Sequence, residues 1–322
     1  MLPAIFSLEG LKVTPAEARV FTLAGPVGFI LFKRNIDTPD QVRALTQELK
    51  NLVGRNCPIL IDQEGGRVAR LGPPHWPSFK PFAHFGTMYA YEPARARTEL
   101  SAQTWDIAQI LLDLGINTNC SPVLDVRAAG AHDIIGDRAF SEHPDVVADL
   151  GDVVCRTFLD VGITPILKHA PGHGRALADS HLELPRVEAS VETLDQIDFA
   201  PFRAVSLEPY AERTWMMTAH ILYPDIDPDW PATLSSRIMK DMIRRQMGYT
   251  GVIIGDDMDM KALDPYGDIV ERSVKTLEAG CDLVLNCHGK LDDMAALGQG
   301  LPKIGESSVK RLAAAAADRY AA

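Results

Sequence analysis

Residues 164–174 read TPILKHAPGHG, and the same kind of pattern recurs along the chain. A short apolar run from Thr164 to Leu167 passes into the polar pair Lys168 and His169, and prolines and glycines follow. A brief, continuous apolar run is typical of a strand buried on both faces, as in a parallel sheet. Proline and glycine then break regular structure, so we expect a strand that ends in polar residues and leads into a long loop.

Eight runs of this kind occur in the chain, and amphipathic stretches of helical period separate most of them. The runs are Ala4 to Ser7, Val27 to Phe32, Pro58 to Ile61, Ile116 to Asn119, Thr164 to Leu167, Trp215 to Thr218, Val252 to Ile254 and Asp282 to Leu285. The helices expected between them include Pro39 to Leu52, Pro93 to Leu114, Pro144 to Val161 and Ser235 to Gln246.

Strand and helix alternating eight times predict an α/β fold with one (β/α)8 TIM-type barrel, and we expect residues 1–322 to form a single domain. An open, doubly wound sheet is the alternative, but it usually carries a glycine-rich phosphate loop after its first strand. Here the first run is followed by Leu8-Glu9-Gly10 without a GxGxxG motif. The alanine run Ala313 to Ala317 is expected to belong to a terminal helix packed on the outside.

The 322 residues carry a formal net charge of −11. This balance argues against nucleic acid and anionic membranes as partners, because both attract clustered lysine and arginine. The five cysteines form no CxxC pair, and their odd number is typical of free thiols in a reducing compartment. The first residues, MLPAIFSLEG, lack the features of a signal peptide, and no apolar stretch approaches about 18 residues. We therefore expect a cytoplasmic protein that does not enter a membrane.

Polar residues stand at or just after the ends of several predicted strands. Asp62 ends the third run, His220 follows the sixth, and Asp256 comes soon after the seventh. In an eight-stranded barrel these strand ends share one face, and catalysis takes place there. We therefore expect Asp62, Lys168, His169, His220 and Asp256 to converge at one mouth of the barrel.

Asp179 and His181 lie two residues apart on the loop that follows Lys168 and His169. In a turn or an extended segment, the carboxylate can orient the imidazole and stabilise its charged form, as in other Asp–His pairs. A loop that such hydrogen bonds merely hold together is the alternative. The density of polar groups at one strand end favours catalysis.

A metal site is a further alternative, since His169, His173 and His181 are potential ligands. The spacing of His169 and His173 would suit a helix, but Pro171 and Gly172 lie between them and disfavour one. We therefore expect neither a metal nor another cofactor.

Asp256 and Asp257 follow the apolar run Val252 to Ile254, and a carboxylate at a buried strand end is a candidate nucleophile. Because neighbouring strand residues point to opposite faces, we expect only one of the two to face the mouth, unless the strand has already ended. A helix N-cap is the alternative for such a pair. Asp62 and Arg70 likewise have two open interpretations, namely contact with a ligand's hydroxyl groups or an ion pair that holds a loop.

Together these segments resemble glycoside hydrolase family 3, and within it the single-domain β-N-acetylhexosaminidases of the NagZ type. The likeness covers nearly the whole chain, and the loop pattern KHAPGHG followed by DSH is its most specific part. The matching segments are LEG at 8–10, GFILFKRN at 28–35, IDQEGGRVARL at 61–71, SPVLDV at 121–126, DRAF at 137–140, KHAPGHG at 168–174, DSH at 179–181, MTAH at 217–220, PATLS at 231–235 and the strand that ends in Asp256.

The resemblance implies a retaining β-N-acetylglucosaminidase in which Asp256 forms a covalent glycosyl-enzyme and His181, assisted by Asp179, is the acid/base. The residues that it implies for binding N-acetylglucosamine (GlcNAc) are Asp62, Arg70, Arg138, Lys168 and His169. The implied substrates are muropeptides in which GlcNAc is β-1,4-linked to 1,6-anhydro-N-acetylmuramic acid. The implied role is peptidoglycan recycling in the bacterial cytoplasm. We expect the chain to act as a monomer.

The chain departs from the family around Asp256, where Gly255, Met258 and Asp259 replace the commoner Ser, Leu and Ser. Three functional alternatives stay open. A family 3 β-glucosidase would usually take a glutamate acid from a second domain. In substrate-assisted catalysis the acetamido oxygen attacks and an aspartate only orients it. A muropeptide-binding sensor would have no activity at all.

Overall fold

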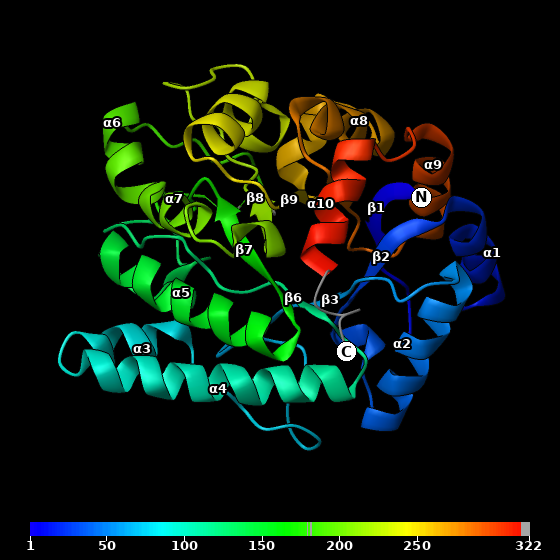
Figure 1. Cartoon of the computed structure of the whole chain (residues 1–322). Helices are drawn as coiled ribbons and strands as arrows, with labels where there is room; N and C mark the ends of the chain where they lie inside the picture. The colour runs from blue at the N-terminus through cyan, green and yellow to red at the C-terminus, as the bar shows by residue number, and fades with distance from the viewer. Residues whose placement is uncertain (179, 181, 317–322) are drawn as a thin grey trace.

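The computed structural model describes residues 1–178, 180 and 182–316. Eight parallel strands form a closed barrel with helices around it (Figure 1), so the predicted (β/α)8 fold is confirmed. Around the barrel the strands follow the order β1-β10-β9-β8-β7-β6-β3-β2, and β2 closes onto β1. The barrel strands are β1 Leu2–Phe6, β2 Pro26–Leu31, β3 Ile59–Ile61, β6 Thr118–Asn119, β7 Thr164–Ala170, β8 Trp215–Thr218, β9 Val252–Asp257 and β10 Leu283–Leu285, and a hairpin is formed by β4 Gln63–Gly65 and β5 Val68–Ala69.

Each predicted apolar run overlaps a barrel strand, and two strands extend at their carboxyl ends beyond the runs that predict them. β7 continues past Lys168 to Ala170, and β9 continues to Asp257. These polar ends remain in the sheet because neighbouring strands continue beside them. Ala170 lies opposite Thr218, and Asp257 lies opposite Leu285. The sheet therefore fixes the backbone of several candidate site residues.

The helices begin and end where the local sequence predicts. Pro39 and Pro144 stand in the first turn of their helices, where a missing N–H is not needed, and Gly54 and Gly162 end the same helices in the left-handed conformation. The predicted helix from Ser235 is a π-helix over Arg237–Gln246. The α-helices are α1 Pro15–Ala24, α2 Pro39–Val53, α3 Phe82–Tyr89, α4 Pro93–Asp113, α5 Pro144–Val161, α6 Val191–Thr193, α7 Ala200–Ser206, α8 Ile269–Ala279, α9 Leu291–Gly300 and α10 Glu306–Ala316. No helix in the described part of the chain has the length and apolar character needed to cross a membrane.

Two hydrophobic cores lie on the two faces of the barrel wall. Ile30, Ile166 and Met217 belong to the core inside the barrel, whereas Phe29 and Leu167 belong to the core between the strands and the helices. Adjacent residues such as Phe29 and Ile30 enter different cores because successive side chains of a strand point to opposite faces. Burial on both faces explains why the strand sequences are apolar throughout rather than alternating.

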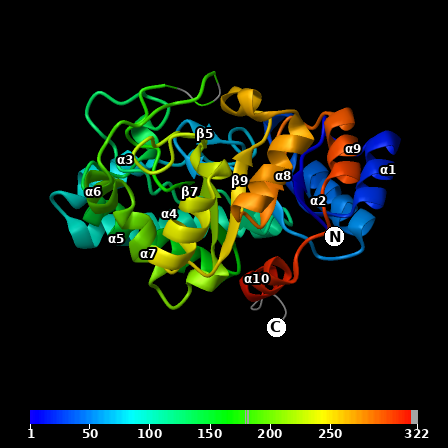
Figure 2. The same cartoon turned by 90° about the horizontal axis from the view of Figure 1, so that it is seen from above.

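α10 lies across one end of the barrel, and this differs from its expected place among the outer helices. Figure 2 shows α10 beyond one end of the strands, with β5 near the opposite end. Leu312 and Ala315 of α10 pack against the core inside the barrel. The C-terminal helix thus closes the end of the barrel that lies opposite the strands' carboxyl ends.

Asp282 joins this helix to the barrel. Its buried carboxylate accepts hydrogen bonds from Ser308 Oγ at 2.6 Å and from Arg311 Nη2 at 2.6 Å, both on α10. The same carboxylate accepts from Arg244 Nη2 at 2.7 Å and from the Ile253 backbone N–H at 2.9 Å. One carboxylate therefore links two arginines, the terminal helix and the start of β9.

We predict that Asp282→Asn lowers the free energy of unfolding by about 3 kcal/mol, because two partly buried arginines lose their shared anionic partner. The loss should appear as a lower urea midpoint. Asp40→Asn is the control, since Asp40 pairs with Arg43 at the surface and its side chain is 96% exposed. That variant should change stability by no more than about 0.5 kcal/mol. Equal losses in both variants would contradict the structural role of Asp282.

Candidate active site

A cavity of about 250 Å³ lies at the carboxyl ends of the barrel strands. Six of the eight site residues predicted from the sequence line it, namely Asp62, Arg70, Arg138, Lys168, His169 and Asp256. The other two, Asp179 and His181, lie outside the described residues. Polar groups that are far apart in the sequence therefore meet at one mouth, as the barrel topology predicts.

Lys168 is the buried cation of this cavity. Its ammonium Nζ lies 2.8 Å from Asp62 Oδ1 and 2.6 Å from Glu64 Oε1, and its side chain is 2% exposed. Burial lowers the pKa of Lys168, but the two carboxylates outweigh burial and hold the pKa above its ordinary value. Burial likewise favours the neutral form of Asp62, but Lys168 and Arg70 hold the Asp62 pKa below its usual range. Lys168 and Asp62 are therefore both charged at neutral pH.

Two arginines complete the network. Arg138 holds Glu64 with two hydrogen bonds of 2.9 Å, and Arg70 Nη2 donates to Asp62 Oδ2 at 3.0 Å. Lys168, Arg70 and Arg138 thus face two carboxylates, which leaves this group of five with one net positive charge. The Arg70 and Asp62 side chains remain 27% and 15% exposed, so they hold the loop and still reach the cavity. Both interpretations of this pair are compatible with the structure.

His169 is fixed by a buried carboxylate. Its Nδ1 lies 2.7 Å from Asp125 Oδ2, and its Nε2 lies 3.4 Å from Arg138 Nη2. Asp125 also accepts the backbone N–H groups of His169 at 3.1 Å and of His173 at 2.6 Å. Both ring nitrogens of His169 have protein partners, which disfavours a metal site shared by His169 and His173.

The start of the loop after β7 is anchored at several points. Tyr223 donates its hydroxyl to the Gly172 carbonyl at 2.5 Å, and Arg175 Nε donates to Asp198 at 2.7 Å. A Cβ on Gly174 would lie 1.8 Å from the Val126 carbonyl oxygen, so only glycine fits there.

His173 lies within this anchored part of the loop. Its side chain is buried, and its Nε2 lies 3.3 Å from Ser180 Oγ. Burial, together with the nearby His169, lowers the pKa of His173 to about 4. This neutral, enclosed imidazole therefore suits a structural role in the loop.

Asp256 and Asp257 both contribute to the lining of the cavity. The Asp257 carboxylate is engaged by the segment after β10, since Oδ1 accepts the Cys287 backbone N–H at 3.0 Å and Oδ2 lies 3.4 Å from His288 Nδ1. The expectation that only one of the two faces the mouth stays a prediction. The pairing of β9 with β10 shifts register beside them, between Leu283 and Leu285. Burial, followed by the charges of Asp259 and Asp256, raises the pKa of Asp257 to about 6.

Three further residues, Glu64, Asp125 and His220, differ from what the sequence predicts for the site. Glu64 and Asp125 were not predicted as site residues, yet they hold Arg138 and His169. Glu64 stands two residues after Asp62, and this spacing places side chains on one side of an extended segment. His220 does not line the cavity but lies behind it, with Nε2 2.9 Å from the Asp257 carbonyl oxygen.

The chain matches known proteins over most of its length. A family model described as the glycosyl hydrolase family 3 N terminal domain matches residues 9–318. A β-hexosaminidase from Alkalilimnicola ehrlichii is 38% identical over 290 residues, which cover 89% of this chain and 80% of that protein. A β-hexosaminidase from Stenotrophomonas maltophilia is 34% identical over 291 residues, which cover 90% of this chain and 85% of that protein.

Solved structures are similar in the same way. NagZ from Neisseria gonorrhoeae, in complex with N-trifluoroacetyl-D-glucosamine, superimposes with a TM-score of 0.87 at 32% identity, covering 97% of this chain and 89% of NagZ. A glycoside hydrolase family 3 β-N-acetylglucosaminidase from Paenibacillus sp. gives a TM-score of 0.89 at 32% identity. The similarity covers 98% of this chain but only 61% of that longer protein.

The raised pKa of Asp257 predicts a pH-dependent stability difference. A carboxyl whose pKa is about 6 when folded, against an ordinary 3.8, stabilises the fold below about pH 4, and this contribution is lost as pH rises through about 6. Asp257→Asn lacks this loss. From pH 4 to pH 7 the stability of the variant relative to wild type should therefore rise by up to roughly 3 kcal/mol. Urea unfolding across this range measures it, and a difference independent of pH would contradict the prediction.

Proposed function

Because the chain belongs to glycosyl hydrolase family 3 and is a β-hexosaminidase of that family, we propose that it releases terminal GlcNAc from muropeptides with retention of configuration. The observation that carries the proposal is the charged cavity in which six predicted site residues meet. At about 250 Å³ the cavity is smaller than pockets of ~300–1,000 Å³ that hold drug-sized ligands. This size suits one terminal sugar rather than an internal segment of a glycan.

The network around Lys168 supports a role in holding that sugar. Asp62 can accept protons from sugar hydroxyl groups, while Arg70, Arg138 and Lys168 can donate to sugar oxygens. Their mutual ion pairs orient these groups before a ligand arrives. Such prior orientation reduces the entropy cost of binding. We assign His169 to the same role because it lines the cavity beside Arg138.

We assign the nucleophile to Asp256. In the proposed reaction a carboxylate oxygen of Asp256 attacks the anomeric carbon while the bond to the leaving oxygen breaks. His181 gives its proton to that oxygen, and Asp179 orients the imidazole. Water that has been deprotonated by His181 then displaces Asp256 and releases GlcNAc. The roles of Asp179 and His181 rest on the sequence, since both residues lie outside the described residues.

A histidine has a physical advantage as this acid. Retaining glycosidases usually pair two carboxyl groups, which repel one another when both are ionised. A neutral imidazole avoids that repulsion with Asp256. The ordinary histidine pKa of about 6.5 also lies near neutral pH, so both protonation states are accessible during turnover.

The proposed natural substrate is GlcNAc β-1,4-linked to 1,6-anhydro-N-acetylmuramic acid with an attached peptide. We place the reaction in peptidoglycan recycling in the bacterial cytoplasm, with the chain acting as a monomer and without a cofactor. The similarity to NagZ over 89% of that chain supports this choice. The direct test is to incubate the protein with an anhydro-muropeptide and detect free GlcNAc by mass spectrometry. Hydrolysis of an aryl β-GlcNAc without hydrolysis of the muropeptide would overturn the substrate but keep the enzyme class.

For the nucleophile, we predict that Asp256→Ala lowers kcat for an aryl β-GlcNAc at least about 10³-fold, because the covalent step is lost. A 5-fluoro glycosyl donor should add one glycosyl mass to the wild-type protein, on the peptide that contains Asp256. If the wild-type protein hydrolyses the aryl β-GlcNAc but forms no adduct with the 5-fluoro donor, substrate-assisted catalysis would be favoured instead. No hydrolysis by the wild type would favour a sensor.

For the acid, we predict that His181→Ala slows the glycosylation step much less for aryl substrates with good leaving groups than for the natural disaccharide. A good leaving group departs without a proton, whereas a sugar alcohol needs one. Pre-steady-state kinetics separates this step from hydrolysis of the glycosyl-enzyme. Equal losses for both substrates would argue against His181 as the acid.

A further inference from the structure

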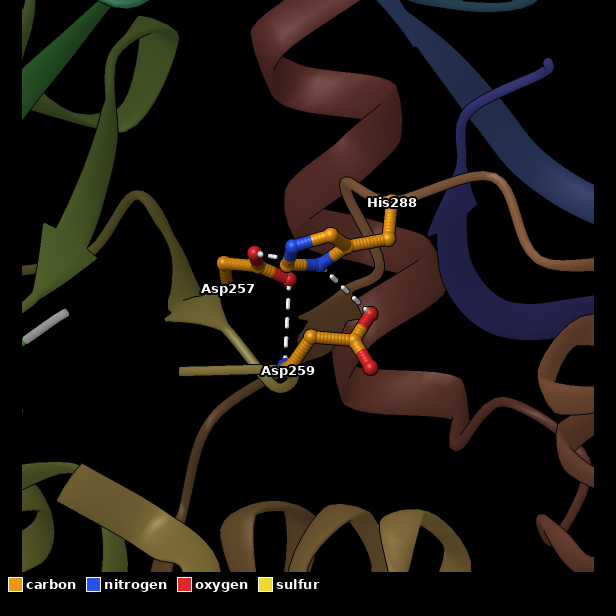
Figure 3. Close-up of side chains that lie close together, drawn as sticks. All are labelled: Asp257, Asp259 and His288. Atoms are coloured by element: carbon orange, nitrogen blue, oxygen red, sulfur yellow. Dashed lines mark hydrogen bonds and ion pairs between the residues drawn. The ribbon is translucent and has the colours of Figure 1, made fainter. Parts of the chain in front are cut away.

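Three side chains with metal-ligand chemistry gather in the wall behind Asp256. Asp257 ends β9, Asp259 follows in the next turn, and His288 comes from the segment after β10. One ligand atom from each lies within 4.8 Å of the others. Figure 3 shows the imidazole of His288 facing both carboxylates. We propose that Asp257, Asp259 and His288 bind a divalent transition-metal cation such as Zn²⁺.

The spacing of the ligand atoms supports a cation rather than a proton between them. His288 Nδ1 lies 3.4 Å from Asp257 Oδ2 and 3.2 Å from Asp259 Oδ2. Hydrogen bonds between charged nitrogen and carboxylate are shorter, at about 2.7–2.9 Å. Zinc binds nitrogen and oxygen at about 2.0–2.2 Å, so neighbouring ligands of a tetrahedral site lie roughly 3.3–3.6 Å apart. Both distances from His288 Nδ1 are close to that tetrahedral spacing.

A buried amide offers a fourth ligand. The Asn286 side chain is fully buried and points at the cluster, with Nδ2 2.6 Å from Asp259 Oδ2. Its Oδ1 is buried without a hydrogen-bond partner among the described residues. An unpaired buried oxygen costs about 1–3 kcal/mol. Rotation of the amide by half a turn would exchange the two atoms and place Oδ1 toward a bound cation.

The backbone orients the first carboxylate for this role. Asp257 Oδ1 accepts the N–H groups of Asp259 at 3.1 Å and of Cys287 at 3.0 Å. These bonds leave Oδ2 directed at His288. A ligand set that the fold already holds in place binds a metal with less loss of side-chain entropy.

Two cationic side chains lie near the cluster. Lys290 Nζ is 4.0 Å from Asp259 Oδ1, but its side chain is 63% exposed and also lies 3.8 Å from Asp293. Arg34 acts on Asp257 through its charge, yet its guanidinium donates to the Leu8 carbonyl at 3.0 Å. Lys290 can therefore turn away when a cation binds, and Arg34 is held outside the ligand set.

The ligand types select the class of metal. Imidazole with carboxylates suits Zn²⁺, Co²⁺ and Ni²⁺, whereas Mg²⁺ and Ca²⁺ prefer oxygen ligands alone. Asp257 and Cys287 also line the cavity that contains Asp256, so the bound cation would lie next to that cavity. The inference does not depend on the proposed function, because metal binding can be measured without substrate.

The test is titration of the full-length, chelator-treated protein with Zn²⁺ by calorimetry and with Co²⁺ by visible absorption. We expect one equivalent of each metal to bind at the cluster and Co²⁺ to give the spectrum of a four-coordinate site. Asp259→Ser and His288→Gln should each weaken binding at least tenfold. His84→Gln is the matched control, because His84 is an exposed histidine on α3 and should bind metal as wild type does.

The outcomes are separable. Circular dichroism confirms that each variant is folded, and His288 tolerates substitution because its side chain is 53% exposed. Loss of binding in both variants, with the control unchanged, supports the site. Absence of binding in the wild type overturns the proposal. Unchanged binding in either variant also overturns it, because the metal would then be held by other residues, such as the histidines of the loop after β7.

Discussion

Lys168 places an ammonium group at the mouth of the barrel with almost no exposure to water, and the surrounding structure compensates for that charge. An isolated buried cation would cost several kcal/mol, so β7 is stable in this register only while Asp62 and Glu64 are close by. The ion pairs therefore tie β7 to the loop after β3, across the barrel strand β6. This one requirement fixes the relative positions of segments more than 100 residues apart, since 106 residues separate Lys168 from Asp62.

The compensation spreads outward from that cation. Glu64 holds Arg138, Arg138 touches His169, and His169 is oriented by Asp125. Each of these charges thus has a partner that is itself fixed. A pocket built in this way is rigid before any ligand enters, and its polar groups need little reorganisation when a sugar binds. The same mutual pairing explains how the site combines three cations with two carboxylates while Lys168 and Glu64 are each only 2% exposed.

Much of this arrangement can be predicted from the sequence, because strand ends in a barrel converge whatever the intervening residues are. Asp62, Lys168 and Asp256 are found at the mouth for that reason. Partnerships between distant residues are harder to predict. Glu64 and Arg138 lie 74 residues apart, and neither position alone indicates the other. The sequence shows that both residues are charged, but it does not show that they form an ion pair with each other.

An irregularity in strand pairing is also hard to predict. The pairing of β9 with β10 shifts register between Leu283 and Leu285, beside Asp256 and Asp257 in the cavity wall. A bulge depends on how the neighbouring strand is placed, and the sequence of one strand does not reveal it. His288 joins Asp257 for a related reason, since it enters from the segment after β10 and the two residues are brought together only by the closed sheet.

The terminal helix carries a consequence for the order of assembly. α10 follows all eight strands in the sequence, yet Leu312 packs against the core inside the barrel. Until that helix docks, the lower side chains of the barrel, Trp215 among them, lack their final cover. During synthesis the strands can pair before α10 is made, so the end of the barrel that α10 covers is completed last. Arg311, which meets the buried Asp282, arrives with α10, whereas Arg244 pairs with the same carboxylate from an earlier segment, so the second of its two arginine partners is added last.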